Sequence, residues 1–153
     1  ALRRFAIACA EAAGLDGEKA TALAEVLLEG DLMGHDTHGL ALLTPYLDSL
    51  AVGDMQAEGD PAIIAATPVV ETWDGRKLPG PWLVRRAIHR AQAMAAAFGI
   101  GAVSIGRCHH IGCLAAYGPP VVAAGQMLIL TCSDPATWWS TRPAASPSKL
   151  KMT

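Results

Sequence analysis

The hydrophobic pattern of this chain of 153 residues changes near residue 60, from the spacing of helices to short runs typical of strands. Before that point the pattern predicts two amphipathic helices in the first 30 residues and a third in residues 40–50. Gly14 ends the first helix, and Asp16 is placed to cap the second through amides near Lys19. The apolar faces expected to be buried hold Leu2, Phe5, Ala6 and Cys9 in the first helix, and Leu23, Ala24, Leu27 and Leu28 in the second.

After residue 60 the pattern predicts strands at residues 62–66 and 69–73, and then a turn at Asp74-Gly75. A long helix follows from Pro81 to Gly99, and then a buried strand at residues 100–105. A short Ala-rich helix broken by Pro119-Pro120 and an apolar strand at residues 127–133 complete the pattern. We therefore expect a helical segment over residues 1–60, a partial α/β domain over 61–135, and an irregular, poorly ordered tail over 136–153.

Composition narrows the classes of function. Twelve basic and fourteen acidic residues give a formal net charge of −2, and no basic stripe is present, so a nucleic-acid partner is not expected. No apolar run approaches the roughly 20 residues of a membrane span, so we expect neither a membrane partner nor an anchor. Four cysteines lack the CxxC spacing of a structural zinc site, and they favour a reducing, cytoplasmic location. The expected partner is a small molecule.

The segment GHDTHGL, residues 34–40, is the first candidate for chemistry. Histidine exchanges protons near neutral pH, and His38 is therefore our first candidate for an acid-base group. Thr37 can hold or polarise the same substrate oxygen, and Asp36 can orient a ring or cap the next helix. The alternative is that Asp36 and Thr37 only cap a helix and that the histidines line an exposed turn.

The second candidate segment is GRCHHIGCLAAYG, residues 106–118, which follows a predicted strand. Backbone amides at a helix start favour a phosphate, and Arg107 can add positive charge. The alternative is that His109 or His110 is a hydrogen-bonded structural histidine. Outside the two segments, the arginines at positions 85, 86 and 90 are expected on a solvated helix face, and the four tryptophans are expected to pack, namely Trp73, Trp82, Trp138 and Trp139.

A zinc site is a competing interpretation of the two histidine segments. His35 and His38 lie three residues apart and can share a face, with further ligands from the second segment. The adjacent His109 and His110 point opposite ways in extended backbone, so at most one of them ligates. We therefore expect no metal, with these residues as the ligands of the alternative: His35, His38, Cys108, His109, His110 and Cys113.

Taken in order, these motifs resemble those of the malate/L-lactate dehydrogenase family, the NAD(P)-dependent 2-hydroxyacid oxidoreductases that lack a Rossmann fold. The resemblance covers about residues 1–135. It rests on the helical opening, on GDLMGHDTHG, which is similar to ADLxGxxSHG, and on the DG turn with PGPW before a long helix. It also rests on GIGAVSIG and on CHHIG, which is similar to SNHxG.

The resemblance implies an α/β (α+β) fold in which amino-terminal helices precede a mixed, largely antiparallel sheet with flanking helices. It implies hydride transfer between NAD or NADP and a small 2-hydroxy acid or 2-oxo acid, in a homodimer. It assigns His38 as the proton donor and acceptor, with Thr37 assisting. It assigns contact with the dinucleotide to His110, Ile111, Gly112, Cys113 and Leu114.

The chain departs from the family pattern in three places. Many members have a carboxylate-binding arginine four residues after the histidine, where this chain has Leu42. Family members continue for roughly another 200 residues, which include an aspartate of the acid-base pair, and the segment after residue 136 does not resemble the PWGG and GTNP motifs. We therefore expect a fragment that is inactive alone and incomplete at its carboxyl end. The alternatives are a truncated remnant or interaction module and, third, a zinc-binding domain.

Overall fold

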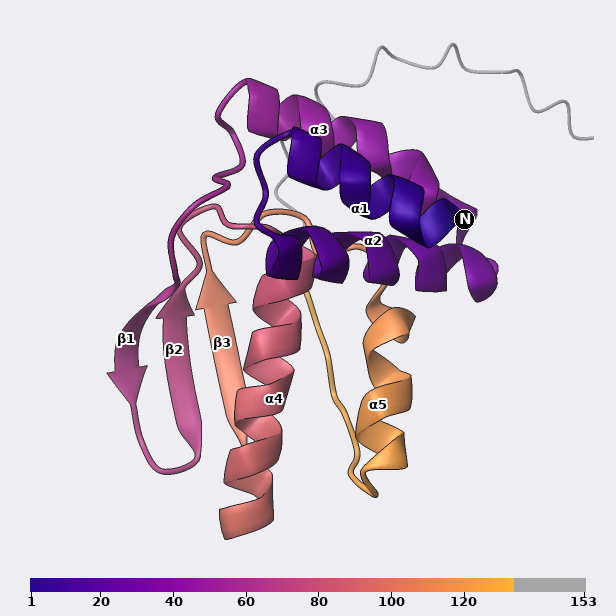
Figure 1. The fold of residues 1–153 in the computed structure, drawn as a ribbon. Coiled ribbons are helices and arrows are strands. Elements are labelled where there is room, and N and C mark those ends of the chain that lie inside the picture. Colours follow the sequence, from indigo (N-terminus) through magenta and orange to yellow (C-terminus); the bar gives the residue numbers. More distant parts are fainter. Residues whose placement is uncertain (134–153) are drawn as a thin grey trace, which may run out of the picture.

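A layer of helices lies over a small sheet and its two neighbouring helices in the computed structural model, which describes residues 1–133 (Figure 1). The upper layer contains α1 (Leu2–Ala12), α2 (Gly17–Leu32) and α3 (Leu43–Ala51). Below it lie the sheet, α4 (Gly80–Phe98) and α5 (Gly118–Ala123). No helix in residues 1–133 is long and apolar enough to cross a membrane.

The start of α2 forms as the sequence predicts. The carboxylate of Asp16 accepts a hydrogen bond of 2.8 Å from the amide of Lys19, which satisfies one of the donors left unpaired at a helix start. Lys19 itself is buried, and its ammonium group pairs with Asp16 and lies over the ring of Trp82. The cap therefore also joins α2 to the start of α4.

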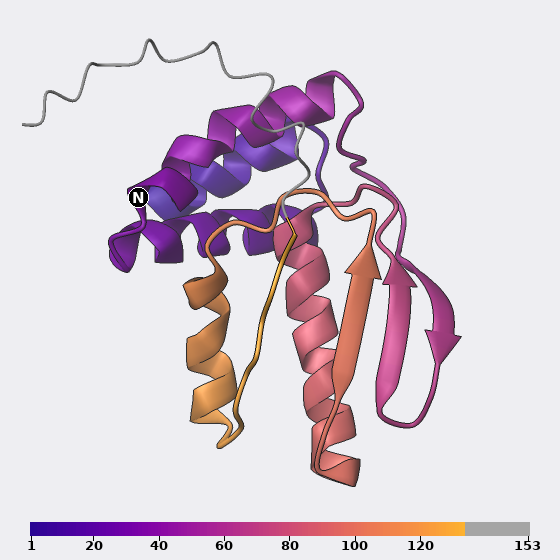
Figure 2. The same ribbon diagram turned by 180° about the vertical axis from the view of Figure 1, so that it is seen from behind.

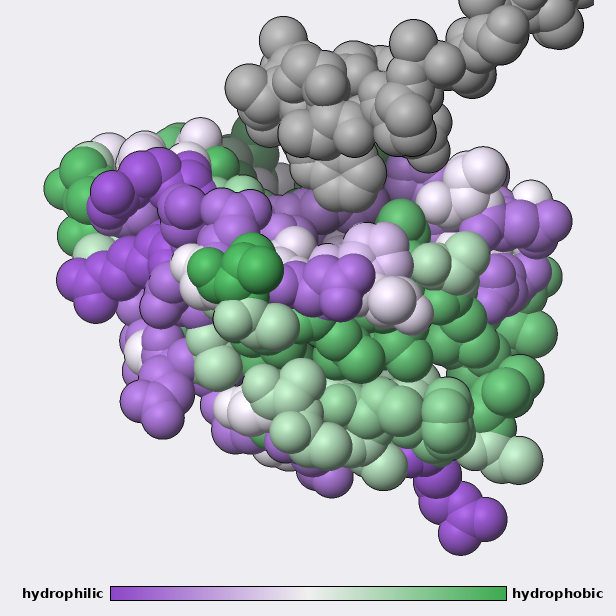
Figure 3. Space-filling view, turned by 90° about the horizontal axis from the view of Figure 1, so that it is seen from above, coloured by the Kyte–Doolittle hydropathy of each residue, from purple (hydrophilic) through white to green (hydrophobic). Residues whose placement is uncertain are grey.

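The buried face of α1 agrees with the prediction at Ala6 and Cys9 and differs from it at the two large side chains. Ala6 and Ala10 face the core, whereas Leu2 and Phe5 are 60% and 64% exposed. Small residues at the contact let α1 lie close to α2. With Ala6 and Ala10 facing α2, the side chains of Leu2 and Phe5 face solvent. Figure 3 looks down on this layer and shows hydrophobic residues gathered over part of its outer face.

Helix α2 is the centre of the molecule because its side chains enter three hydrophobic clusters. Leu23 and Leu27 pack with α1 and α3, and Ala22 packs with Leu78, Trp82 and Leu83 at the start of α4. A third cluster joins Val26 of α2 to Val84 and Tyr117. These contacts across residue 60 tie the helical layer to the lower part; the predicted division at residues 60 and 135 stays a prediction.

The sheet has three strands in the order β1 (Ala62–Ala66), β2 (Val70–Asp74) and β3 (Ala102–Gly106). The pairing of β1 with β2 is antiparallel and that of β2 with β3 is parallel, so the sheet is mixed, as expected. Helix α4 makes the parallel crossover and lies against β3 (Figures 1 and 2). Pro81 stands in its first turn, and Gly99 ends it with a φ of 83°.

From β3 to the start of α5, the structure differs from the prediction in three respects. The buried strand predicted at residues 100–105 forms as β3, but within β3 only Val103 and Ile105 are partly covered. Pro119 and Pro120 begin α5 rather than breaking a helix, because the first turn of a helix needs no amide donors. Before them, residues 114–117 form a 3-10 turn.

The strand expected at residues 127–133 is not formed. The segment runs beside α5 rather than beside β3 (Figure 2), so its backbone has no neighbouring strand to pair with among the described residues. Leu128 and Leu130 pack into the cluster around Tyr117, while Met127 and Ile129 are 86% and 82% exposed. Side chains therefore alternate between packed and exposed, as in a strand, although the backbone forms no strand-to-strand hydrogen bonds among the described residues. The tail predicted for residues 136–153 lies outside the described residues.

Candidate active site

The two histidine segments meet beneath the carboxyl end of α2. The rings of His38 and His110, far apart in sequence, stack with their centroids 5.7 Å apart and their planes 28° from parallel. His38 and His110, one from each predicted segment, are therefore neighbours in the structure. The stacking puts two groups able to exchange protons side by side.

The first segment forms a short 3-10 turn, Asp36–His38, after α2. The hydroxyl oxygen of Thr37 lies 2.9 Å from Nδ1 of His38, so Thr37 and His38 are in contact as the resemblance implies. Asp31 holds the end of the turn, because its carboxylate accepts a hydrogen bond of 3.0 Å from the amide of Leu40. The absence of a side chain at Gly39 makes room for this carboxylate.

The second segment is held by Tyr46, a buried residue of α3. Its hydroxyl donates to the carbonyl oxygen of His110 at 2.7 Å and lies 2.8 Å from Nδ1 of the same residue. Tyr46 is 2% exposed, and burial raises its pKa far above the usual value for a tyrosine. The hydroxyl therefore stays protonated and can donate at every physiological pH.

Two glycines let the segments approach so closely. A Cβ atom at position 30 would lie 2.7 Å from the carbonyl oxygen of His38 and 3.3 Å from Cβ of Cys113. A Cβ atom at position 80 would collide with the carbonyl oxygens of His109 and His110. The backbones of the two segments thus pack directly against Gly30 in α2 and Gly80 at the start of α4.

The neighbouring Cys108 and His109 are structural. Burial raises the pKa of the Cys108 thiol to about 11, so the thiol is neutral, and it donates a 2.9 Å hydrogen bond to the carbonyl of His109. Burial also lowers the pKa of His109 and favours its neutral form, and its ring lies 5.4 Å from that of Tyr46. Within the described residues Nδ1 of His109 has no hydrogen-bond partner, so the expectation of a hydrogen-bonded structural histidine in this loop fits His110, which contacts Tyr46, and not His109.

The ligands proposed for zinc do not assemble. Within residues 1–133, no three His, Cys, Asp or Glu side chains come close enough together to hold a metal ion. His38 contacts Thr37 and His110 instead. The zinc interpretation has no support in this part of the chain.

Of the residues assigned to the cofactor, Leu114 lines an apolar pocket. Leu114 is half-exposed and lines a pocket of about 490 Å³ together with Met127 and Leu128. Arg107, the cation expected beside a phosphate, is instead bound to Asp74, with 2.9 Å between its Nε and the carboxylate. The pocket lining is largely apolar, and the guanidinium of Arg107 is paired with Asp74 rather than free.

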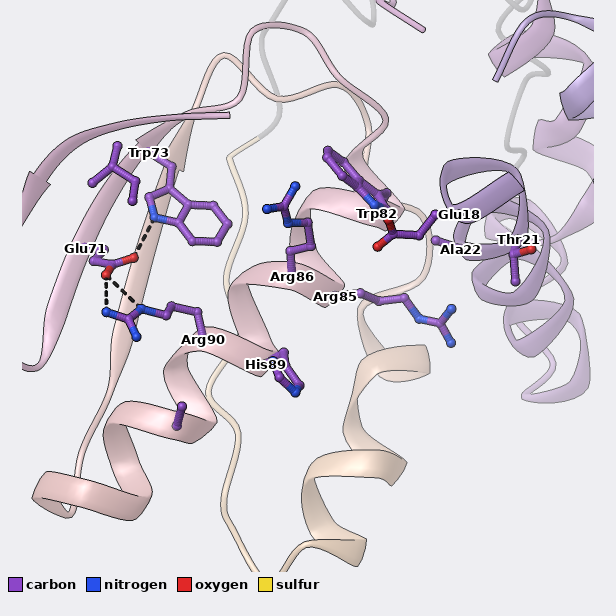
Figure 4. Close-up of a pocket in the computed structure, with 12 residues that line it drawn as sticks. Glu18, Thr21, Ala22, Glu71, Trp73, Trp82, Arg85, Arg86, His89 and Arg90 are labelled. Atoms are coloured by element: carbon purple, nitrogen blue, oxygen red, sulfur yellow. Dashed lines mark hydrogen bonds and ion pairs between the residues drawn. The ribbon is translucent and has the colours of Figure 1, made fainter. Parts of the chain in front are cut away.

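A pocket of about 910 Å³ lies away from the histidine pair, between α2, α4 and the sheet (Figure 4). The arginines of α4 that line it are exposed, as predicted, but each is paired. Arg85 binds Glu25 and Arg86 binds Asp60. Arg90 binds Glu71, a buried carboxylate that also accepts from the indole of Trp73 at 2.9 Å. These pairs join elements of the fold, and the pocket contains none of the predicted site residues.

Leu42, which stands at the family's usual arginine position, ends the second 3-10 turn, Leu40–Leu42. Its side chain packs against the core of the helical layer rather than pointing a polar group at the histidines. Trp73 and Trp82 are buried, as predicted for packing residues, whereas Trp138 and Trp139 lie outside the described residues.

The sequence pattern of one family, malate/L-lactate dehydrogenase, matches residues 1–145. The chain belongs to the malate/L-lactate dehydrogenase family. The solved structure of malate dehydrogenase from Pyrococcus horikoshii OT3 superposes with a TM-score of 0.79 at 26% identity, over 81% of this chain and 36% of that one. Malate dehydrogenase from Entamoeba histolytica gives 0.78 at 26% identity, over 81% and 35%.

Curated relatives extend the likeness. Malate/(S)-sulfolactate dehydrogenase of Methanothermus fervidus is 26% identical over 95% of this chain and 41% of its own length. Hydroxycarboxylate dehydrogenase B of Escherichia coli K12 is 28% identical over 76% of this chain and 32% of its own length. The chain thus spans well under half the length of these relatives. Its family is one of oxidoreductases, and the mixed α/β fold is the one expected.

Proposed function

We propose that this chain is the amino-terminal part of an oxidoreductase that transfers a hydride between NAD or NADP and a small 2-hydroxy acid or its 2-oxo acid. The observation that carries the proposal is the stacking of His38 on His110 in a chain of the malate/L-lactate dehydrogenase family. It supports the proposal because a histidine able to transfer a proton then lies beside the segment assigned to the cofactor.

In this mechanism His38 takes the hydroxyl proton of the substrate as the carbon loses its hydride, and it returns a proton to the oxygen in the reverse direction. The contact of 2.9 Å between Thr37 and Nδ1 orients the ring, so Nε2 is the nitrogen that faces the substrate oxygen. The exposed position of His38 gives a small acid access to this nitrogen. Thr37 assists by fixing the ring.

Residues His110, Ile111, Gly112, Cys113 and Leu114 would hold the cofactor. When bound, NAD or NADP supplies the hydride acceptor or donor. The contribution of this chain is an apolar wall at Leu114 and a backbone brought close by Gly112, which has a φ of 72°. With Arg107 bound to Asp74, the phosphates require partners other than this arginine.

The remaining parts of the proposal follow from the family. Because Leu42 packs into the core, another residue binds the substrate carboxylate. We place the protein in the cytoplasm as a homodimer, with neither nucleic acid nor membrane as a partner. Its four cysteines are free thiols, as a reducing compartment favours.

The test is a panel of 2-oxo acids offered with NADH and with NADPH to the protein at its full native length. Oxaloacetate, pyruvate and sulfopyruvate represent different groups at the far end of the substrate. We expect oxidation of at least one cofactor with at least one acid, measured by the loss of absorbance of the reduced nicotinamide. Absence of turnover with every pair would overturn the proposal and leave the alternative hypothesis, a catalytically inactive interaction module.

A further inference from the structure

Tyr46 links the helical core to the second histidine segment. Its ring is buried in the cluster of α1, α2 and α3, and its hydroxyl reaches out of that cluster to His110. Because the core fixes the ring on all sides, the hydroxyl oxygen has a defined place. It is therefore a fixed point against which the loop of His110 is held.

The hydrogen-bond chemistry of this contact decides where His110 carries a proton. A tyrosine hydroxyl has one proton, and a carbonyl oxygen can only accept. The contact of 2.7 Å with the carbonyl of His110 therefore uses the hydroxyl proton. The hydroxyl oxygen can then only accept from Nδ1 at 2.8 Å, which requires a proton on Nδ1.

The competing arrangement is weaker. The amide of Gly112 lies 3.2 Å from Nδ1 and would donate to it if that nitrogen were unprotonated. In that case the hydroxyl of Tyr46 would face two acceptors with one proton, and one of the two short contacts would have no hydrogen between its atoms. Protonation at Nδ1 satisfies both short contacts with Tyr46 and gives up the longer contact with the amide of Gly112.

We propose that Tyr46 is a positioning residue: it holds His110 in the tautomer protonated at Nδ1 and so fixes its ring against that of His38. The His38 ring then has Thr37 bonded at its edge and His110 stacked on its face. A change in the orientation of His110 is transmitted to His38 through this stack. The inference rests on the proposed function for its effect on turnover, but not for the tautomer itself.

The first test reads the tautomer directly, by nitrogen NMR of the imidazole rings in the histidine-labelled protein. We expect the neutral ring of His110 to be protonated at Nδ1 in the unsubstituted protein. A neutral ring protonated at Nε2 would overturn the proposal without any variant having to fold.

The second test compares Tyr46→Phe with Tyr117→Phe. Tyr117 is the matched control because it is also buried, and its hydroxyl donates to a backbone carbonyl of the same loop, that of Ile111. Tyr46→Phe should move the His110 ring to the Nε2 tautomer and shift the signals of His38. Tyr117→Phe should leave both rings unchanged. Equal changes in the two variants, or none in either, would contradict a specific role for Tyr46.

The kinetic readout separates this proposal from the function on which it rests. In the full-length protein, Tyr46→Phe should lower kcat by roughly tenfold or more with KM little changed, the scale of a misplaced reacting group. Tyr117→Phe should retain kcat within about twofold of the unsubstituted protein. A rise in KM with kcat unchanged would overturn the positioning role. If full-length protein lacks turnover altogether, the proposed function fails, while the NMR result still decides the role of Tyr46.

Discussion

At the scale of single residues, Gly30 sets how closely the two histidine segments approach α2. Replacement with alanine would place a Cβ atom 2.7 Å from the backbone oxygen of His38, and backbone cannot swing away as a side chain can. We expect Gly30→Ala to lower the free energy of unfolding by about 1–3 kcal/mol, the usual cost of overpacking. It should also separate the rings of His38 and His110. Urea unfolding and ring-to-ring nuclear Overhauser effects measure the two changes.

Gly118→Ala is the control for that substitution. Gly118 begins α5 with an ordinary helical φ of −67°, and no atom lies within 4 Å of a Cβ atom built there. The alanine should be neutral or stabilising by up to about 1 kcal/mol. If both variants unfold at the same urea concentration, the close packing at Gly30 does not carry the stability ascribed to it.

Residue types identified part of the site and could not identify the rest. His38 and Thr37 were predicted because their side chains carry recognisable chemistry, whereas His110 was assigned through the family resemblance. Tyr46 and Gly30 were missed because their roles exist only through contacts between segments distant in the chain. A tyrosine on the helix that follows the first histidine segment was the available signal, but tyrosine at helical spacing is ordinarily a packing residue.

At the scale of elements, Glu71 fastens β2 to α4. Its carboxylate is 3% exposed and accepts from both Arg90 and Trp73. We expect Glu71→Gln to lower Tm more than Asp60→Asn, because the Asp60 side chain is 73% exposed and its pair with Arg86 is shared with water. Differential scanning calorimetry compares the two. An equal or larger drop for Asp60→Asn would show that burial of Glu71 is unimportant.

The same pair carries a pH dependence. The hydrogen bond from Arg90 holds the pKa of Glu71 below its ordinary value of 4.5. Its stabilisation is thus fully present above that value and is lost as the pH falls through the lower folded pKa. The difference in Tm between the unsubstituted protein and Glu71→Gln should therefore narrow in acid.

Elements with local signals were predicted well from the sequence. The cap at Asp16, the strand at residues 62–66 and the helix stop at Gly99 each depend on neighbouring residues, and each is confirmed. The prediction of a strand at residues 127–133 was wrong. A strand needs a hydrogen-bonded neighbour, and sequence periodicity does not specify one. The exposure of Leu2 and Phe5 likewise depends on how α1 rotates against α2.

At the scale of the whole molecule, α5 and the segment that follows it leave apolar side chains exposed. Val122, Met127 and Ile129 are 68%, 86% and 82% exposed, and β3 is an edge strand among the described residues. We expect the chain of 153 residues to self-associate as its concentration rises. Sedimentation velocity should find less association for the double variant Met127→Lys/Ile129→Lys.

Val52→Lys provides the control, because Val52 is 79% exposed at the end of α3, in the helical layer above the sheet. It should leave the association unchanged. A chain that sediments as a monomer over the whole concentration range would contradict the prediction, as would equal effects of the two variants.

The central claim is that His38 exchanges the substrate proton, and comparing His38→Ala with His35→Ala in the full-length protein tests it most directly. His35 precedes the same 3-10 turn and is exposed, without a ring contact to His110 in the described structure. With a 2-oxo acid and reduced nicotinamide, His38→Ala should lose about 10²-fold or more in kcat/KM, the scale of a positioned proton-transfer group. His35→Ala should stay within a few-fold of the unsubstituted protein. Unchanged turnover in His38→Ala would contradict the claim.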